Sequence, residues 1–274
     1  MILKTKMSNK CLSFIGLGLN DEKDLSLKAL EEIKKSEKIF AEFYTAKLMG
    51  TTIEKLEKLY GKKVNVLNRK ETEKGDIIIN SSKKHNTVFL TAGDSMTATT
   101  HFDLRIRAIK ENIDTKIIHG SSIITAVPSL LGLQNYKFGR TTTIAYPQKD
   151  FFPTSPYDVI TNNLKNNLHS LVLLDIKDEE KRYMTANEGI KILLDMEEKK
   201  HGDIFKDKII CVVARAGSKN PIVKADVAKK ILKYDFGSPL HSLVVPAKLH
   251  FMEIEALKML AQLPAQQVRK LQKL

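Results

Sequence analysis

The chain has 274 residues and a hydrophobic fraction of 42%, which suits one large or two moderate globular cores. It lacks a run of about eighteen apolar residues, the length that a membrane helix needs. Its two cysteines make no disulfide framework, so we expect a cytoplasmic protein. We expect no membrane partner and no metal site.

The net charge of +13 is compatible with nucleic-acid binding. Acidic and basic residues are nevertheless mixed along the helical segments, and no recognition module or long basic tail is visible. We therefore do not expect direct nucleic-acid binding, although a positive surface could steer the chain toward an acidic protein partner.

Apolar strand patterns alternate with helical patterns along the chain. The patterns predict strands near residues 12–17, 38–42, 64–67, 87–91, 116–119, 141–146, 171–176, 208–214 and 242–246. They predict helices near residues 24–36, 50–59, 97–111, 123–131, 156–167, 185–197, 224–234 and 247–261. Such alternation indicates an α/β fold with mainly parallel sheets.

The alternation is interrupted by turn residues between Pro128 and Gly139. We place a domain boundary there, which gives an N-terminal α/β domain over residues 12–134 and a C-terminal α/β domain over residues 135–274. The first ten residues, Met1 to Lys10, are too polar for the apolar core of a signal peptide, and residues 1–11 lie before the first domain. We expect them to form a flexible extension, in which Met7 could be an alternative start.

The first predicted strand ends in a glycine-containing turn, Gly16 to Leu19. A Rossmann dinucleotide fingerprint needs a third glycine where Asp21 stands, and no P-loop lysine with its Ser/Thr partner is present. The sequence therefore argues against binding of NAD or of a nucleoside triphosphate by these standard loops.

A second turn follows the strand predicted over residues 87–91. Gly93 permits a close approach of the backbone to a ligand, and Asp94 can accept hydrogen bonds from hydroxyls or lie near a cation. Open α/β sheets bind ligands at this end of their strands. Alternatively, Asp94 or Ser95 could simply cap the helix that follows.

Short motifs continue in order through both predicted domains, over roughly residues 12–257. They read Phe14-Ile-Gly-Leu-Gly-Leu19, Ala41-Glu-Phe-Tyr-Thr45, Gly93-Asp94, Ala98-Thr-Thr-His101, Leu104-Arg-Ile-Arg107, Ile118-His-Gly-Ser-Ser-Ile123, Tyr136-Lys-Phe-Gly139, Phe152-Pro-Thr-Ser155, Leu173-Leu-Asp-Ile-Lys177, Met184-Thr-Ala-Asn-Glu188, Ala214-Arg-Ala-Gly217 and Pro239-Leu-His-Ser-Leu-Val-Val-Pro246. As an ordered set they resemble the diphthine synthases, a family of S-adenosylmethionine-dependent methyltransferases in the tetrapyrrole-methylase-like group.

The resemblance implies that S-adenosylmethionine lies in a cleft between the two domains. The first domain would supply Leu19, Asp94, Thr97, Ser122 and Ile123, and the second Leu174, Ala216 and His241. Some of these residues have a structural alternative. Leu174 and Ile123 could be core residues, Ser122 a helix cap, and His241 a hydrogen-bonded structural histidine.

The resemblance also implies the acceptor, which is the amino group of the 3-amino-3-carboxypropyl-histidine of elongation factor 2 in diphthamide biosynthesis. Three methyl groups would be added, and the enzyme would be a homodimer. An α-amino group titrates near about 8, so a fraction is always neutral and no strong base is needed. The sequence identifies no catalytic base.

The segment from Asp175 to Met184 is short, as in archaeal members of the family, whereas eukaryotic members carry an insertion there and also make a methyl ester. This favours trimethylation without esterification. A related methyltransferase acting on a precorrin or on ribosomal RNA would share the fold and the cofactor. A non-catalytic basic binding protein remains an alternative that only the net charge supports.

Overall fold

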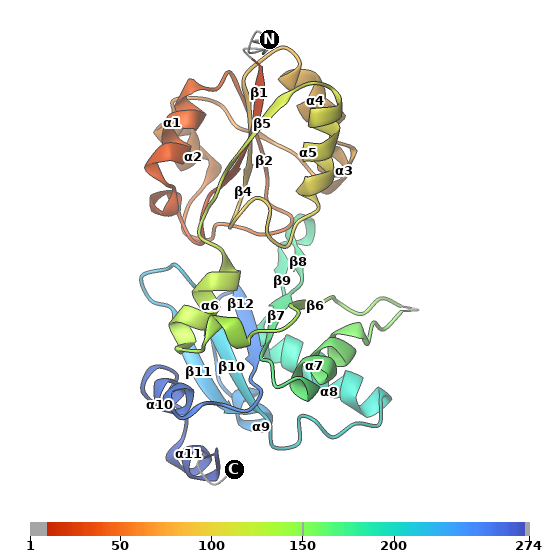
Figure 1. The fold of residues 1–274 in the computed structure, drawn as a ribbon, viewed down its shortest axis with the longest axis vertical. Helices are drawn as coiled ribbons and strands as arrows, with labels where there is room; N and C mark the ends of the chain where they lie inside the picture. Colours follow the sequence, from red (N-terminus) through yellow and green to blue (C-terminus); the bar gives the residue numbers. More distant parts are fainter. Residues whose placement is uncertain (1–9, 150, 272–274) are drawn as a thin grey trace, which may run out of the picture. The chain divides into compact units, whose positions relative to one another are not determined.

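The computed structural model describes residues 10–149 and 151–271, which form two compact units that divide between Ser122 and Ile123 (Figure 1). Most of the predicted N-terminal extension, residues 1–9, lies outside the described residues, and Cys11 is already the first residue of a strand. No helix within the described ranges is long and apolar enough to cross a membrane.

The first unit contains a parallel sheet of five strands in the order β3-β2-β4-β1-β5. The strands, as far as the unit is described, are β1 (Cys11–Gly16), β2 (Lys38–Glu42), β3 (Asn65–Val66), β4 (Thr87–Thr91) and β5 (Asp114–Ile118). The helices are α1 (Leu27–Lys35), α2 (Ile53–Tyr60), α3 (Arg69–Lys74), α4 (Asp76–Ser82) and α5 (His101–Lys110), with a 3-10 turn at Glu22–Asp24.

Both faces of this sheet are covered. Helices α1 and α2 lie on one face, and α4 and α5 lie on the other (Figure 1). The alternation of side chains along β1 matches this arrangement, because Phe14 belongs to the core under α4 and α5 whereas Ile15 belongs to the core under α1 and α2. A sheet buried on both faces explains why every residue of β4 is buried.

The second unit has a mixed sheet in the order β11-β10-β12-β7-β6. Its described strands are β6 (Thr142–Ile144), β7 (Ser170–Leu174), β10 (Ile209–Ala214), β11 (Ile222–Val227) and β12 (His241–Val245), beside a small hairpin of β8 (Ile176–Lys177) and β9 (Arg182–Tyr183). The helices are α6 (Ile123–Leu131), α7 (Ser155–Lys165), α8 (Ala186–Lys199), α9 (Ala228–Ile231), α10 (Phe251–Leu260) and α11 (Ala265–Leu271), with 3-10 turns at Asn135–Lys137 and Asp178–Glu180.

The expectation of mainly parallel sheets is confirmed in the first unit and fails in the second. Within the described part of the second sheet only β6 and β7 pair in parallel, and the other three pairings are antiparallel. The chain between β10 and β11 is too short for the crossover helix that parallel strands require. Consequently residues 224–227, predicted as the start of a helix, belong to β11 and pair with β10.

The boundary between the units also differs from the predicted one. Helix α6 was placed in the first domain, but Val127 and Leu131 on this helix are buried in a core of the second unit. The helix begins at Ile123, directly after the division. The start of the second unit is therefore set by the burial of the apolar face of α6 and not by the turn residues that follow this helix.

Candidate functional site

The carboxyl ends of β1, β4 and β5 lead into turns that meet at glycines. A Cβ atom on Gly16 would lie 2.5 Å from the Gly93 carbonyl oxygen and 2.6 Å from the Gly120 nitrogen. The Gly93 amide donates to the Gly18 carbonyl at 2.6 Å, and the Gly18 amide donates back to the Gly93 carbonyl at 3.2 Å. Since no side chain fits between these backbones, we call Gly16, Gly93 and Gly120 the glycine junction.

Leu19 lies in the turn that leaves β1. The carboxylate of Asp24 holds this turn, because its Oδ2 accepts from the amides of Leu19 at 3.0 Å and Asn20 at 2.7 Å. The backbone amide of Leu19 is therefore already bonded, and its half-buried side chain is what the residue can offer to a ligand.

Asp94 holds the turn after β4. Its side chain is 7% exposed. Its Oδ1 accepts from the Met96 amide at 3.0 Å and from the Thr97 hydroxyl at 3.1 Å. Burial raises the pKa of Asp94, but hydrogen bonds from Met96, His119 and Thr97 outweigh this effect and lower the pKa below its usual value. The turn thus contains a buried carboxylate that is ionised at neutral pH.

Two of the predicted residues, Asp94 and Thr97, are thus in direct contact. His119 was not predicted as a site residue, yet its Nδ1 lies 2.7 Å from Asp94 Oδ2 while 74% of its side chain is exposed. Its position in the Ile118–Ile123 motif, directly after β5, was the only signal. Ser122 follows in the same segment and ends the first unit.

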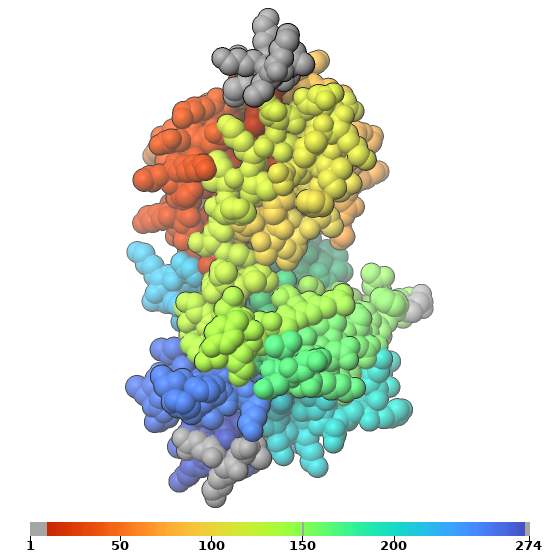
Figure 2. All heavy atoms as spheres, viewed as in Figure 1, coloured from red at the N-terminus to blue at the C-terminus, as the bar shows by residue number. Residues whose placement is uncertain are grey.

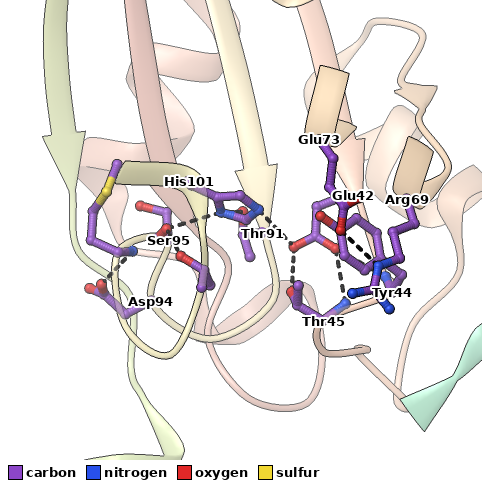
Figure 3. A network of polar contacts seen from close by, with 11 residues as sticks. Glu42, Tyr44, Thr45, Arg69, Glu73, Thr91, Asp94, Ser95 and His101 are labelled. Atoms are coloured by element: carbon purple, nitrogen blue, oxygen red, sulfur yellow. Dashed lines mark hydrogen bonds and ion pairs between the residues drawn. The ribbon is translucent and has the colours of Figure 1, made fainter. Parts of the chain in front are cut away.

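A buried polar network continues from this turn into the sheet (Figure 3). His101 begins α5, and its Nδ1 lies 3.1 Å from the Ser95 carbonyl oxygen. Its Nε2 lies 3.5 Å from Oε1 of Glu42, the last residue of β2. Both residues lie within the sequence motifs, Glu42 in Ala41–Thr45 and His101 in Ala98–His101, but neither was predicted as a site residue.

The other predicted residues belong to the second unit, where they share one edge of the sheet. Leu174 ends β7, Ala216 follows β10, and His241 begins β12. Ile123 was predicted in the first domain but begins α6 and packs on a core of the second unit. Leu174 is buried in the other core of that unit.

His241 has both ring nitrogens bonded to the backbone. Its Nδ1 accepts from the Ala186 amide at 3.0 Å, and its Nε2 lies 3.0 Å from the Ser238 carbonyl oxygen, to which it donates. Burial lowers the pKa of His241, so the ring is neutral. Any polar contact of His241 with a cofactor must therefore use its backbone.

The class of protein follows from the fold. The family model described as Tetrapyrrole (Corrin/Porphyrin) Methylases matches residues 11–231, from β1 in the first unit to the end of α9 in the second. The match thus spans both α/β units of the chain.

Individual relatives narrow this class. The chain is 50% identical over 255 residues to a diphthine synthase of Methanosarcina barkeri, covering 91% of this chain and 96% of the relative. It is 52% identical over 255 residues to a diphthine synthase of Methanocaldococcus jannaschii, covering 92% and 99%. A crystal structure of diphthine synthase matches with a TM-score of 0.86 at 38% identity, covering 94% of this chain and 99% of that one.

The chain belongs to the diphthine synthase family of methyltransferases. The resemblance predicted from the sequence motifs is therefore confirmed, together with the assignment to diphthamide biosynthesis.

Proposed function

We propose that the chain binds S-adenosylmethionine beside the glycine junction and transfers its methyl group to the amino group of the 3-amino-3-carboxypropyl-histidine of elongation factor 2. The observation that carries the proposal is that Gly93, where nothing lies within 4 Å of a Cβ position, stands directly before a buried, ionised Asp94. Both lie at the carboxyl ends of parallel strands, where open α/β sheets bind ligands.

The residues of the first unit fit such a cofactor. Asp94 accepts three hydrogen bonds, and a carboxylate has about four acceptor sites, so it retains capacity for a hydroxyl or an ammonium group. At Gly93 nothing lies within 4 Å of the position that a Cβ atom would take, so a ligand can approach the backbone at this glycine of the junction. Leu19, Thr97 and Ser122 complete the contacts that we assign to this unit.

The second unit would supply Ile123, Leu174 and Ala216 as apolar contacts and the backbone of His241 as a polar one. When bound, S-adenosylmethionine supplies a methyl group already activated by a sulfonium. The chain therefore has to orient the acceptor amine and exclude water, and it need not form a covalent intermediate. We assign no residue as a catalytic base.

Methyl transfer tests this proposal directly. Elongation factor 2 carrying the 3-amino-3-carboxypropyl-histidine should gain one, two and then three methyl groups in mass spectra. Factor with an unmodified histidine is the control and should gain none. Transfer to a precorrin or to ribosomal RNA instead would contradict the acceptor that we propose.

A second proposal concerns the product, namely whether a methyl ester is formed. The segment after β7 forms only the β8–β9 hairpin, closed by a 3-10 turn at Asp178–Glu180. We propose on this basis that the carboxylate of the acceptor is not methylated. A fourth methyl group that is lost under mild alkali would be an ester and would refute this part.

We also propose that the protein is a cytoplasmic homodimer. Phe102, Ile106 and Ile109 are exposed on α5 at the spacing of one helix face. The side chains of α5 lie on the face of the first unit shown in yellow in Figure 2. A second copy would cover such a stripe, as exposed apolar patches commonly mark interfaces. Light scattering should give twice the mass of one 31.0 kDa chain, and a monomer at micromolar concentration would contradict the proposal.

A further inference from the structure

The buried network next to the Asp94 turn contains two titratable side chains that the proposed function does not use. Glu42 is 0% exposed and His101 is 2% exposed. Neither belongs to the contacts that we assign to the cofactor. His101 contacts the carbonyl of Ser95, which directly follows Asp94, so the pair is joined to the proposed site through the backbone.

Glu42 is held by neutral donors. Its Oε2 accepts from the amides of Tyr44 at 3.0 Å and Thr45 at 3.1 Å, and the Thr45 hydroxyl donates to Oε1. These bonds fix the turn after β2 and leave Oε1 facing the ring of His101. The carboxyl group is therefore fixed in place without a cation among these donors.

The geometry fixes the tautomer of His101. A carbonyl oxygen only accepts hydrogen bonds, so the proton must be on the Nδ1 that contacts Ser95. The ring is also held edge-on against Phe89, with centroids 4.9 Å apart. Its Nε2 has no hydrogen-bond partner within the described residues, and Glu42 Oε1 lies opposite it at 3.5 Å.

Counting protons then decides the state of the pair. If Glu42 were ionised and His101 neutral, two buried acceptors would face each other without a proton. One added proton resolves this conflict, either on the carboxyl group or on the ring. Burial raises the pKa of Glu42 and lowers that of His101 to about 4, so the proton belongs on Glu42.

The charged side chains nearest the pair have polar contacts of their own. Arg69 pairs with Glu73, with Nε 2.8 Å from Oε1, beside the ring of Tyr44. On the other side, Asp94 contacts His119. These two pairs supply no obvious reason to ionise Glu42.

We propose that Glu42 is a neutral carboxylic acid that donates to His101 Nε2, and that this pair positions the Ser95 carbonyl and hence the Asp94 turn for the cofactor. Both are positioning residues. The 3.5 Å separation is longer than an ordinary hydrogen bond, and polar contacts of this kind often tighten when a ligand binds. The proposal rests on the cofactor site described above.

The first test uses the free protein and needs no cofactor. Nitrogen NMR of the imidazole should show His101 as the neutral Nδ1–H tautomer, with no titration between about pH 5 and 8. A doubly protonated ring at pH 7 would overturn the proposal. If instead the wild-type protein failed to bind S-adenosylmethionine, the proposed function would fail while this measurement stayed valid.

The second test compares two variants of Glu42 by calorimetry with S-adenosylmethionine. Glu42→Leu removes the donor, and we expect about tenfold weaker binding. Glu42→Gln should restore most of that affinity, because its NH2 group can donate to His101 and to the Thr45 hydroxyl while its carbonyl accepts from the two amides. A glutamine variant as weak as the leucine variant would show that an ionised carboxylate is needed.

A third variant, His101→Phe, keeps the ring shape and the contact with Phe89 but cannot contact Ser95 through a nitrogen. We expect it to bind about tenfold more weakly, like Glu42→Leu. Should Glu42→Leu fail to fold, this variant and the NMR measurement still decide the proposal. Full affinity in a folded His101→Phe protein would exclude a positioning role.

Discussion

Each unit contains a buried glutamate–histidine pair, and the two pairs hold their protons differently. In the second unit, Glu253 is 1% exposed and its Oε1 lies 3.0 Å from His169 Nε2. The Nδ1 of His169 accepts from the Ala247 amide at 2.9 Å, so Nε2 carries the proton and donates to the carboxylate. In the first unit the tautomer of His101 is the opposite, and we infer that the acid donates to the ring.

The additional partner of Glu253 explains this difference. The amino group of Lys137 donates to its Oε2 at 2.7 Å, alongside the amides of Gln134 and His250. Burial raises the pKa of Glu253, but these bonds and that from His169 lower it to about 2. The four donors to Glu253 include one cation, whereas those to Glu42 are neutral. Burial alone thus does not set the ionisation of a carboxyl group.

The largest effect should come from removing the charge of the second pair. Glu253→Gln should lower the free energy of unfolding at pH 7 by about 3 kcal/mol, because it leaves Lys137 partly buried without its counter-charge. Glu255→Gln on the exposed side of α10 is the control and should change it by less than about 0.5 kcal/mol. Urea unfolding measures both.

The same variant predicts a pH dependence. The folded pKa of Glu253 is depressed, so its contribution is present above the unfolded value near 4.5 and is lost as the pH falls toward 2. The unfolding free energies of wild type and Glu253→Gln should therefore converge in this range. A constant difference between pH 7 and pH 3 would mean that Glu253 is not the ionised group.

In contrast to Glu253, which we expect to affect the free energy of unfolding, Asp94 should mainly affect the affinity for the cofactor. Asp94→Ala should weaken S-adenosylmethionine binding by roughly 1.5–3 kcal/mol, the value of a charge-assisted hydrogen bond. Asp114→Ala, an exposed aspartate at the opposite end of β5, serves as the control. Calorimetry that gave equal affinities for the two variants would remove Asp94 from the site.

His241 is a third buried histidine, and both of its ring nitrogens bond to the backbone. His241→Phe should reduce the free energy of unfolding by roughly 1–2 kcal/mol, since the Ala186 amide and the Ser238 carbonyl lose their partner. Cofactor affinity should change little, because we assign the contact to its backbone. A stable variant with strongly reduced affinity would place the ring in the binding site.

The smallest expected effect concerns Glu42, whose contribution to the free energy of unfolding should change with pH in the opposite direction to that of Glu253. Its folded pKa is raised, so the unfolded chain releases this proton first and stability is lost as the pH rises from 4.5 through the folded value. Glu42→Gln removes this loss, and its unfolding free energy relative to wild type should increase over that range. A decrease would indicate that Glu42 is ionised in the folded protein.

The sequence predicted the Asp94–Thr97 turn because both residues lie within one short segment whose chemistry is local. It could not predict the contact between Glu42 and His101. That contact depends on β2 lying next to β4 in the sheet, a pairing between strands that are distant along the chain. The motifs contained both residues, but a motif does not show which residues will meet.

The secondary structure was likewise predictable only where the local sequence pattern is distinctive. Strands β1, β2 and β4 of the first unit were predicted to within one residue because each contains a compact apolar run. Helix α3 was missed although Asn68 and Glu71 form a capping box, because all of its own residues, Arg69–Lys74, are polar. In the second unit, residues 224–227 were predicted as the start of a helix, but they pair with β10 as part of β11.

The glycine junction has a consequence for mutational scanning. Gly16, Gly93 and Gly120 have no side chains that could move aside, so a methyl group added at Gly16 or Gly120 would press on the backbone of the other turns. The other two residues of the junction are already glycine, so no substitution there can make room for the added methyl group. We therefore expect that substitutions of Gly16 and Gly120 cannot be rescued by second-site substitutions within the junction. The turns after β1, β4 and β5 should tolerate or reject substitutions together.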